Sequence, residues 1–350
     1  MKFRIFALVA ALFVFTSLIS FAAAQDQTEC AAGFWLFDHE RLATDPVCMP
    51  DNPQRIISLD MPATEFLLLN DIPIVGVFNY AADEISAITP GFADDLADIP
   101  RFDWPPNLEL VTELNPDLII AFKDSSLFYS GMDEIAPLVV YDAAYATDWK
   151  SSTAFWSEVF GKEDAYTEML ATYDARVAEL QEALGDDRGE IEVSAFVPSP
   201  DYPMIWLIDS AQGVILQDVG LGRPESQNQT FADGGYVEGG ADYGFVAIST
   251  EALDLADGDE IFLFSWASTD AEVTATNQAY LEEFNQTNPI WQTLSGVREG
   301  NVHIVGAHWF RAQTYLAANL ILDDLFANLT DVEPTIPSPA AEFVTLETAE

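Results

Sequence analysis

Residues 107–121 read NLELVTELNPDLIIA, and this stretch contains a complete helix–turn–strand unit. Asn107 is a favourable N-cap residue and Glu109 adds a negative charge to the first turn, so a short helix is predicted to begin here. The NPD motif then predicts a turn, and the apolar run LIIAF at 118–122 predicts a buried strand. A continuous apolar strand after a helix is typical of a parallel sheet covered on both faces.

The same alternation extends on both sides of this unit. Strands are predicted at residues 54–60, 73–78, 118–122 and 138–141 in the first half, and at 192–197, 204–208, 261–266 and 302–305 in the second. Between the halves, residues 163–184 carry apolar side chains at helical spacing, which predicts a helix roughly 33 Å long. The pattern predicts an α/β fold with two doubly wound lobes, largely parallel sheets and one long bridging α-helix.

The first 24 residues have the features of a cleavable secretory signal peptide. Lys2 and Arg4 precede a long apolar run, and Ala22 to Ala24 supplies an A-x-A cleavage site. An uncleaved membrane anchor is the alternative, because the run approaches the length needed to span a bilayer. Cys30 does not follow the run directly, so no lipoprotein anchor is predicted. We therefore expect a periplasmic or extracellular protein.

The rest of the chain divides into five parts. These are an N-terminal segment at 25–52, an N-terminal lobe at 53–160, the connecting helix at 161–187, a C-terminal lobe at 188–330 and a tail at 331–350. The tail is rich in proline and acids and is predicted to be flexible. Cys30 and Cys48 both lie in the N-terminal segment, and in an exported chain they are predicted to form a disulfide.

The charge of the chain is strongly negative. It has 58 acidic residues against 13 basic ones, for a formal net charge of −45. Nucleic acid is excluded as a partner, because its phosphates require basic surface. Disorder is disfavoured, because 49% of the residues are hydrophobic and 12% are aromatic. An acidic surface suits saline surroundings, with an ordinary acidic soluble protein as the alternative.

The second half repeats the opening unit in a weaker form. Ser249-Thr250-Glu251 predicts a helix start, followed by an acidic turn and the strand at 261–266. Two lobes built alike would present Glu109 and Glu251 in matching positions. The alternative is that each acid only stabilises its own helix, as acids in a first turn commonly do.

Several runs together resemble the periplasmic binding proteins for siderophores, haem and cobalamin. The resemblance is carried by PQRIISL at 53–59, VGVFNY at 75–80, NLELVTELNPDLIIA at 107–121 and NVHIVGAHWFRA at 301–312. It implies a ligand cleft between two lobes and a membrane-embedded ABC permease as partner. It also implies that Glu109 and Glu251 pair with arginines of that permease.

In doubly wound sheets, ligands bind beyond the carboxyl ends of the strands, and this rule selects candidate residues in the following loops. The ligand-binding residues predicted from this rule and from the resemblance are Tyr80, Arg101, Trp104, Lys123, Arg223, Trp266, Trp309 and Arg311. The four basic residues indicate an anionic ligand, since bases are scarce in this chain. A salt bridge is the alternative for each base, and a core position is the alternative for each aromatic residue.

This mixture favours a ferric siderophore as ligand, with haem and cobalamin as alternatives in the same family. The three histidines, at positions 39, 303 and 308, form no short-spaced cluster with carboxylates, so neither a metal site nor a resident cofactor is predicted. An enzyme is the alternative from another class, but the chain lacks a nucleophile elbow, a P-loop and an H-E-x-x-H motif. We therefore expect a monomeric binding protein and not an enzyme.

Overall fold

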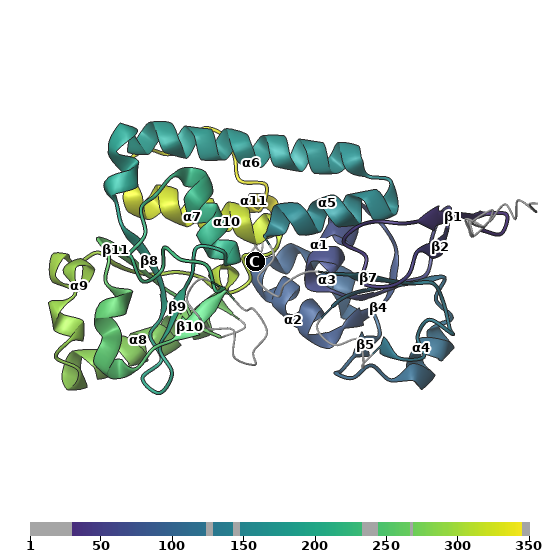
Figure 1. The fold of residues 1–350 in the computed structure, drawn as a ribbon, viewed down its shortest axis with the longest axis horizontal. Coiled ribbons are helices and arrows are strands. Elements are labelled where there is room, and N and C mark those ends of the chain that lie inside the picture. The colour runs from purple at the N-terminus through teal and green to yellow at the C-terminus, as the bar shows by residue number, and fades with distance from the viewer. Residues whose placement is uncertain (1–29, 124–128, 143–147, 233–243, 267–268, 345–350) are drawn as a thin grey trace, which may run out of the picture.

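The computed structural model describes residues 30–123, 129–142, 148–232, 244–266 and 269–344. The predicted signal peptide lies outside these residues. Figure 1 shows two α/β lobes with one long helix, α6, extending along both of them. The predicted fold class is confirmed: each lobe contains a five-stranded sheet, and most strand pairs are parallel.

The N-terminal lobe has a fully parallel sheet in the order β5-β4-β3-β6-β7. Its strands are β3 (Ile56–Leu59), β4 (Ile74–Phe78), β5 (Arg101–Phe102), β6 (Leu118–Phe122) and β7 (Leu138–Tyr141). Its helices are α1 (Met61–Leu69), α2 (Asn79–Ile88), α3 (Ala93–Ala97), α4 (Leu108–Leu114) and α5 (Trp149–Phe160), with the 3-10 helix η1 (Pro90–Phe92). The helix–turn–strand unit predicted from residues 107–121 is therefore α4 followed by β6.

Both faces of this sheet are covered, because successive side chains of each strand point in opposite directions. Ile56 and Ile120 pack in one apolar cluster with Phe66 of α1 and Trp156 of α5. Strand neighbours such as Ile57 and Ile119 belong to a second cluster, which contains Ile85 of α2 and Val111 of α4. The continuous apolar runs of the sequence are a direct consequence of this double coverage.

The C-terminal lobe has a mixed sheet in the order β10-β9-β8-β11-β12. Its strands are β8 (Val193–Val197), β9 (Met204–Trp206), β10 (Phe245–Ala247), β11 (Glu260–Leu263) and β12 (Val302–Ile304), and β9 is antiparallel to both of its neighbours. Its helices are α7 (Ala211–Val219), α8 (Asp270–Thr287), α9 (Ser295–Glu299) and α10 (Tyr315–Leu329), with the 3-10 helices η3 (Asp186–Glu190), η4 (Thr250–Ala256), η5 (Trp291–Thr293) and η6 (Ala307–Trp309). The second predicted helix start therefore begins a 3-10 helix and not an α-helix.

The long connecting helix α6 spans Glu163–Leu184, as its apolar spacing predicts. It is fixed to the C-terminal lobe by Arg176, whose side chain is fully buried. Its Nη1 atom donates to the backbone and side-chain oxygens of Asn319 at 2.9 and 2.8 Å, and Nη2 pairs with Asp323. Both partners belong to α10, so these contacts join α6 to α10.

The N-terminal segment forms a two-stranded antiparallel hairpin beside the first lobe (Figure 1). Its strands are β1 (Phe34–Phe37) and β2 (Val47–Pro50), and Cys30 is bonded to Cys48 with an S–S distance of 2.03 Å. Phe37 and Met49 are buried in the lobe's core, so the hairpin is attached by packing as well as by the chain.

The prediction of a flexible tail is wrong for residues 331–344. Thr335 donates through its backbone N and its Oγ1 to Oε1 of Glu179, at 2.6 Å each. Further along, the short helix α11 (Ala341–Val344) carries Phe343, whose ring stacks on Phe92 of η1 with centroids 4.4 Å apart. The composition resembles a linker, but its few apolar residues have partners on the lobes. Residues 345–350 lie outside the described part of the chain.

In the described parts of the chain, no helix is both long and apolar enough to cross a membrane.

Candidate functional site

The first lobe presents a row of aromatic rings just after strands β4 and β5. Helix α2 begins directly after Phe78, so Tyr80 lies in its first turn, and the two rings are 5.4 Å apart. Trp104 follows β5, and its ring lies 5.3 Å from Phe78 and 5.8 Å from Tyr129. The predicted residues Tyr80 and Trp104 therefore belong to one group of rings, although Phe78 lies between them.

The second lobe presents a matching row. Trp266 is 57% exposed, and its ring lies 5.3 Å from Phe310 and 6.3 Å from Phe245. Phe310 in turn lies 5.9 Å from Trp206, which is buried. An exposed indole supported by partly buried rings is a preformed flat surface for a large ligand.

Arg311 joins the two rows. Its Nη2 atom pairs with Oε1 of Glu84 on α2 at 2.7 Å, and the two side chains are only 12% and 13% exposed. Its guanidinium carbon lies 4.3 Å from the ring centroid of Phe310 and 5.5 Å from that of Tyr80. A single cation therefore contacts rings of both lobes, and the lobes meet at this point. We call Tyr80, Glu84, Phe310 and Arg311 the junction cluster.

Two other predicted bases lie on the first lobe and already have acidic partners. Arg101 is exposed, pairs with Asp83 of α2 and lies 3.4 Å from Oδ1 of Asn79. Lys123 is exposed, and its Nζ lies 3.0 Å from both carboxylate oxygens of Asp142. An anionic ligand would have to displace a carboxylate at either position, or bind the pair through its remaining donors.

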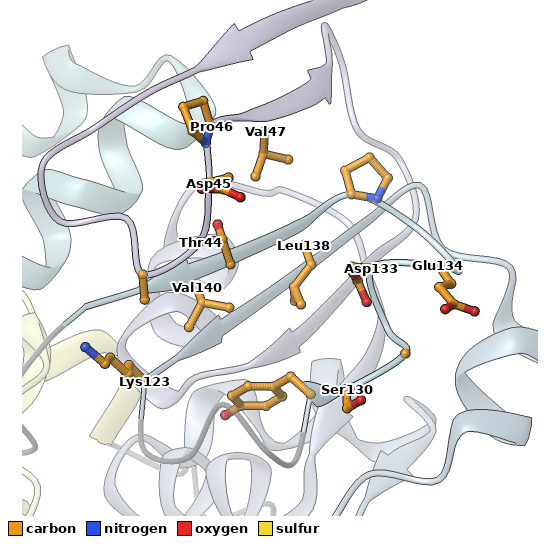
Figure 2. Close-up of a pocket in the computed structure, with 14 residues that line it drawn as sticks. Thr44, Asp45, Pro46, Val47, Lys123, Ser130, Asp133, Glu134, Leu138 and Val140 are labelled. Atoms are coloured by element: carbon orange, nitrogen blue, oxygen red, sulfur yellow. The ribbon is translucent and has the colours of Figure 1, made fainter. Parts of the chain in front are cut away.

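Lys123 also lines a separate cavity. Figure 2 shows this cavity, of about 1040 Å³, along the edge strand β7. Its other charged side chains are Asp45, Asp133 and Glu134. None of the other predicted ligand residues lines it, and three carboxylates against one lysine make it unfavourable for an anion. The cavity is therefore not part of the junction cluster.

Trp309 is not a ligand residue in this structure, and that prediction is wrong. Its side chain is fully buried, its ring stacks on Phe262 at 4.8 Å, and its Nε1 donates to Oδ2 of Asp324 at 2.7 Å. It is a core residue with a satisfied polar atom, the alternative that always applies to a lone tryptophan.

Arg223 lies inside the second lobe and not in an open loop. It is 6% exposed, and its Nη2 donates to the Trp206 carbonyl and to Oε1 of Gln227, at 2.6 Å each. Burial lowers the pKa of this guanidinium to about 9. Its hydrogen bond to the Trp206 carbonyl connects it to the second aromatic row.

The two acids predicted to contact a permease occupy equivalent places in the lobes. Glu109 lies in the first turn of α4, where Asn107 Oδ1 accepts its backbone N–H at 2.8 Å, and Glu251 lies in the first turn of η4. Each element immediately precedes the strand that pairs with the first strand of its sheet, β6 beside β3 and β11 beside β8. Both side chains are exposed.

Glu84 is absent from the predicted ligand residues, as is Phe310. It lies four residues after Tyr80 on α2, so the two side chains share a helix face. Recognising that α2 begins directly after β4 would have placed this face beyond the carboxyl end of a strand. Among the described residues, no group of three His, Cys, Asp or Glu side chains could hold a metal ion.

Two α/β lobes joined by one long helix, with rings and a cation meeting between them, define a two-lobed ligand-binding protein. Comparison with known families agrees with this class. Residues 73–308 match the family described as periplasmic binding protein, and the chain belongs to that family.

Individual relatives are similar over most of their length. The chain is 30% identical over 286 residues to the probable siderophore-binding lipoprotein YfiY of Bacillus subtilis, covering 79% of this chain and 82% of the relative. It is 24% identical over 300 residues to the ferric enterobactin-binding periplasmic protein FepB of Escherichia coli, covering 80% and 86%. The crystal structure of Staphylococcus aureus SirA with staphyloferrin B superimposes with a TM-score of 0.65 at 24% identity, covering 84% of this chain and 98% of SirA.

Proposed function

We propose that this protein is the extracytoplasmic substrate-binding component of an ABC importer and that its cargo is a ferric siderophore. The junction cluster carries the proposal, because Arg311 presents a cation between aromatic rings of two lobes. Such a surface suits a bulky, flat and anionic chelate. The named relatives support the same ligand class, since YfiY is described as a probable siderophore-binding lipoprotein and FepB as binding ferric enterobactin.

Haem and cobalamin are the alternative cargoes, since both are large and the resemblance includes proteins that bind them. We propose that the protein acts by capture and delivery alone, without catalysis, and as a monomer. We also propose that it works outside the cytoplasm after removal of its signal peptide. FepB is described as periplasmic and YfiY as a lipoprotein, and both descriptions agree with work outside the cytoplasm.

Calorimetric titration of the purified protein with ferric enterobactin, ferric staphyloferrin B, haem and cobalamin tests the cargo. We expect saturable binding of at least one ferric chelate, weakened by Trp266→Ala because an exposed stacking surface is lost. Trp35→Ala is the matched control, since Trp35 is an exposed indole on the hairpin strand β1. If neither ferric chelate binds, or if the two variants lose affinity equally, the proposed cargo or its site is incorrect.

Delivery to a permease is tested with Glu109→Ala combined with Glu251→Ala. We expect unchanged affinity for the ferric chelate but loss of uptake in cells that carry the cognate permease, since both acids are exposed and neither belongs to the junction cluster. The matched control is Glu113→Ala with Asp254→Ala, which removes two exposed acids from the same elements, α4 and η4. Normal uptake by the first double variant would refute the docking role.

A further inference from the structure

The C-terminal segment 331–344 makes a further connection between the two lobes, in addition to the contacts of Arg311 with Glu84. It leaves α10 of the second lobe, contacts the connecting helix α6, and ends against η1 of the first lobe. Figure 1 shows its last helix, α11, between the lobes and below α6. We call this segment the strap.

The first attachment of the strap is to Glu179 of α6. Its carboxylate accepts Thr335 N and Thr335 Oγ1 at 2.6 Å each, and Ile336 N at 3.1 Å. Hydrogen bonds to an ionised acceptor are stronger than neutral ones. Because α6 is fixed to α10 through Arg176, this attachment belongs to the second lobe.

The second attachment is to η1 in the first lobe. Phe343 stacks on Phe92 with an interplanar angle of 23°. The strap backbone lies directly on η1, since a Cβ added to Gly91 would approach Cα of Phe343 to 2.9 Å. Ala340, just before α11, is fully buried in the largest apolar cluster. This attachment is therefore packed and not a loose surface contact.

The second attachment of the strap is close in the chain to the junction cluster. Helix η1 follows α2 after one residue, and α2 carries Tyr80 and Glu84 of the junction cluster. We propose that the strap is an intramolecular clasp that limits how far the two lobes can separate. Separation of the lobes would pull Phe343 from Phe92 or Thr335 from Glu179, because the two attachments belong to different lobes. The clasp thereby also fixes α2 relative to Arg311.

Distances between spin labels on the two lobes test the clasp without any ligand, so its failure would not affect the proposed function. Labels are attached through Glu113→Cys on α4 and Glu282→Cys on α8, both exposed. We expect a single narrow distance distribution in this labelled parent. Adding Phe343→Ala and Glu179→Ala, which break both attachments, should broaden the distribution and shift it to longer distances.

Val344→Ser in the same labelled parent is the matched control, since Val344 is 38% exposed and adjacent to Phe343. It should leave the distribution unchanged. A chain ending at Thr330 should broaden the distribution as the double variant does, and the double variant decides if that shorter chain does not fold. The proposal is overturned if protease cleavage within the strap becomes faster in the double variant while the distance distribution stays that of the parent.

Discussion

Arg311 makes two kinds of interaction within the junction cluster, and a bound ligand would compete with one of them. It pairs with Glu84 in a partly buried setting, and it lies over the rings of Phe310 and Tyr80. The pair makes the junction cluster electrically neutral before ligand binds. An anionic chelate must therefore compete with Glu84 for the guanidinium, and this competition gives the two partners opposite effects on affinity.

We expect Arg311→Gln to weaken an anionic ferric chelate by about 10- to 100-fold, the range of one or two charge-assisted hydrogen bonds. Glu84→Gln should tighten the same chelate, because it frees the guanidinium while keeping the shape of the side chain. A neutral chelate should change little in either variant. Titration of both variants with one anionic and one neutral ferric chelate measures this, and equal losses for both ligands would show that the pair is structural.

Glu65 of α1 connects the lobes at a second, fully buried point. Its Oε1 accepts the backbone N–H of Leu316 at the start of α10, 3.1 Å away. Burial raises the pKa of Glu65 from 4.5 to about 7, although hydrogen bonds from α10 oppose the shift. The folded protein then binds this proton more tightly than the unfolded chain. Its stability contribution is greatest below pH 4.5 and is lost as the pH rises through about 7.

We expect Glu65→Gln to stabilise the protein at pH 8 by up to about 3 kcal/mol, because the amide keeps the acceptor without the buried charge. The gain should shrink toward pH 5. Some pH dependence will remain, since burial also raises the pKa of Asp60 to about 7. Urea unfolding between pH 5 and 8 measures this, with exposed Glu168→Gln on α6 as control. A loss of stability at pH 8 would mean that the α10 N-terminus outweighs the desolvation of the carboxylate.

Residues 309–311 show what a sequence can predict about single side chains. All three lie in one region after a strand, and the sequence predicts that this region lies near a ligand site. Trp309 nevertheless points into the core, whereas Phe310 packs on Trp206 of its own lobe and Arg311 contacts Glu84 of the other lobe. The difference comes from the 3-10 helix η6, which ends at Trp309 and was not predicted. The local direction of the backbone decides which of these three side chains is buried, and the residue types alone do not show that direction.

At the scale of elements, an aspartate before one strand accepts backbone N–H groups before the neighbouring strand in both lobes. Asp117, just before β6, accepts the backbone N–H groups of Gln54 and Arg55 at 2.7 and 2.9 Å, ahead of β3. Asp259, just before β11, accepts the N–H of Glu192 at 2.9 Å, ahead of β8. In each lobe an acid therefore fixes the start of the first strand beside its neighbour. The similarity between the two halves of the sequence therefore includes the hydrogen bond to an aspartate from the backbone before the first strand.

We expect Asp117→Ala to cost about 1–2 kcal/mol and Asp259→Ala less, since a charged acceptor contributes two bonds in the first case and one in the second. Removing the acceptor leaves these N–H groups to water, which limits the loss because both places are near solvent. Thermal unfolding compared with Asp254→Ala, an exposed acid of η4, measures the effect. Equal melting temperatures for Asp117→Ala and the control would contradict the structural role.

Elements with a strong burial pattern were predicted best. The bounds of α6, β6 and β7 agree with the sequence, because each has a regular apolar stripe or a continuous apolar run. Helix α8 was missed, since only Val273, Asn277 and Phe284 are buried along its 18 residues. The helix predicted from Ser249 became the 3-10 helix η4, in which Ser249 makes no capping bond. At the start of η4, the Thr250 carbonyl accepts a hydrogen bond from Nδ2 of Asn288 at 2.8 Å.

At the scale of the whole molecule, the sequence predicts two lobes but not how they meet. Arg311 and Glu84 lie 227 residues apart, and Glu65 and Leu316 lie 251 apart. Single-chain periodicity carries no information about such pairs, because each residue is also compatible with an ordinary solvated or core position. The strap is the same case: its composition predicts disorder, and its two attachments depend on surfaces formed by distant segments.

The net charge of −45 is a property of the whole molecule and predicts a dependence on salt. Like charges repel more strongly in the compact state, and screening weakens that repulsion. We expect the melting temperature to rise between about 10 mM and 1 M sodium chloride, as the screening length falls from about 30 to about 3 Å. Salt also weakens the attraction between Arg311 and Glu84, which would lower the melting temperature. This effect is smaller, because the two side chains are only 12% and 13% exposed and their interaction is screened less.

A charge-reduced variant separates screening from other effects of salt. Glu168→Gln, Glu282→Gln and Glu283→Gln together remove three exposed acids from α6 and α8 without touching a contact that joins the lobes. This variant should melt higher than the parent in low salt and should gain less as salt is added, because less repulsion remains to be screened. Parallel melting curves for the two proteins would mean that salt acts on apolar burial and not on charge, and the acidic surface would then contribute nothing to salt tolerance.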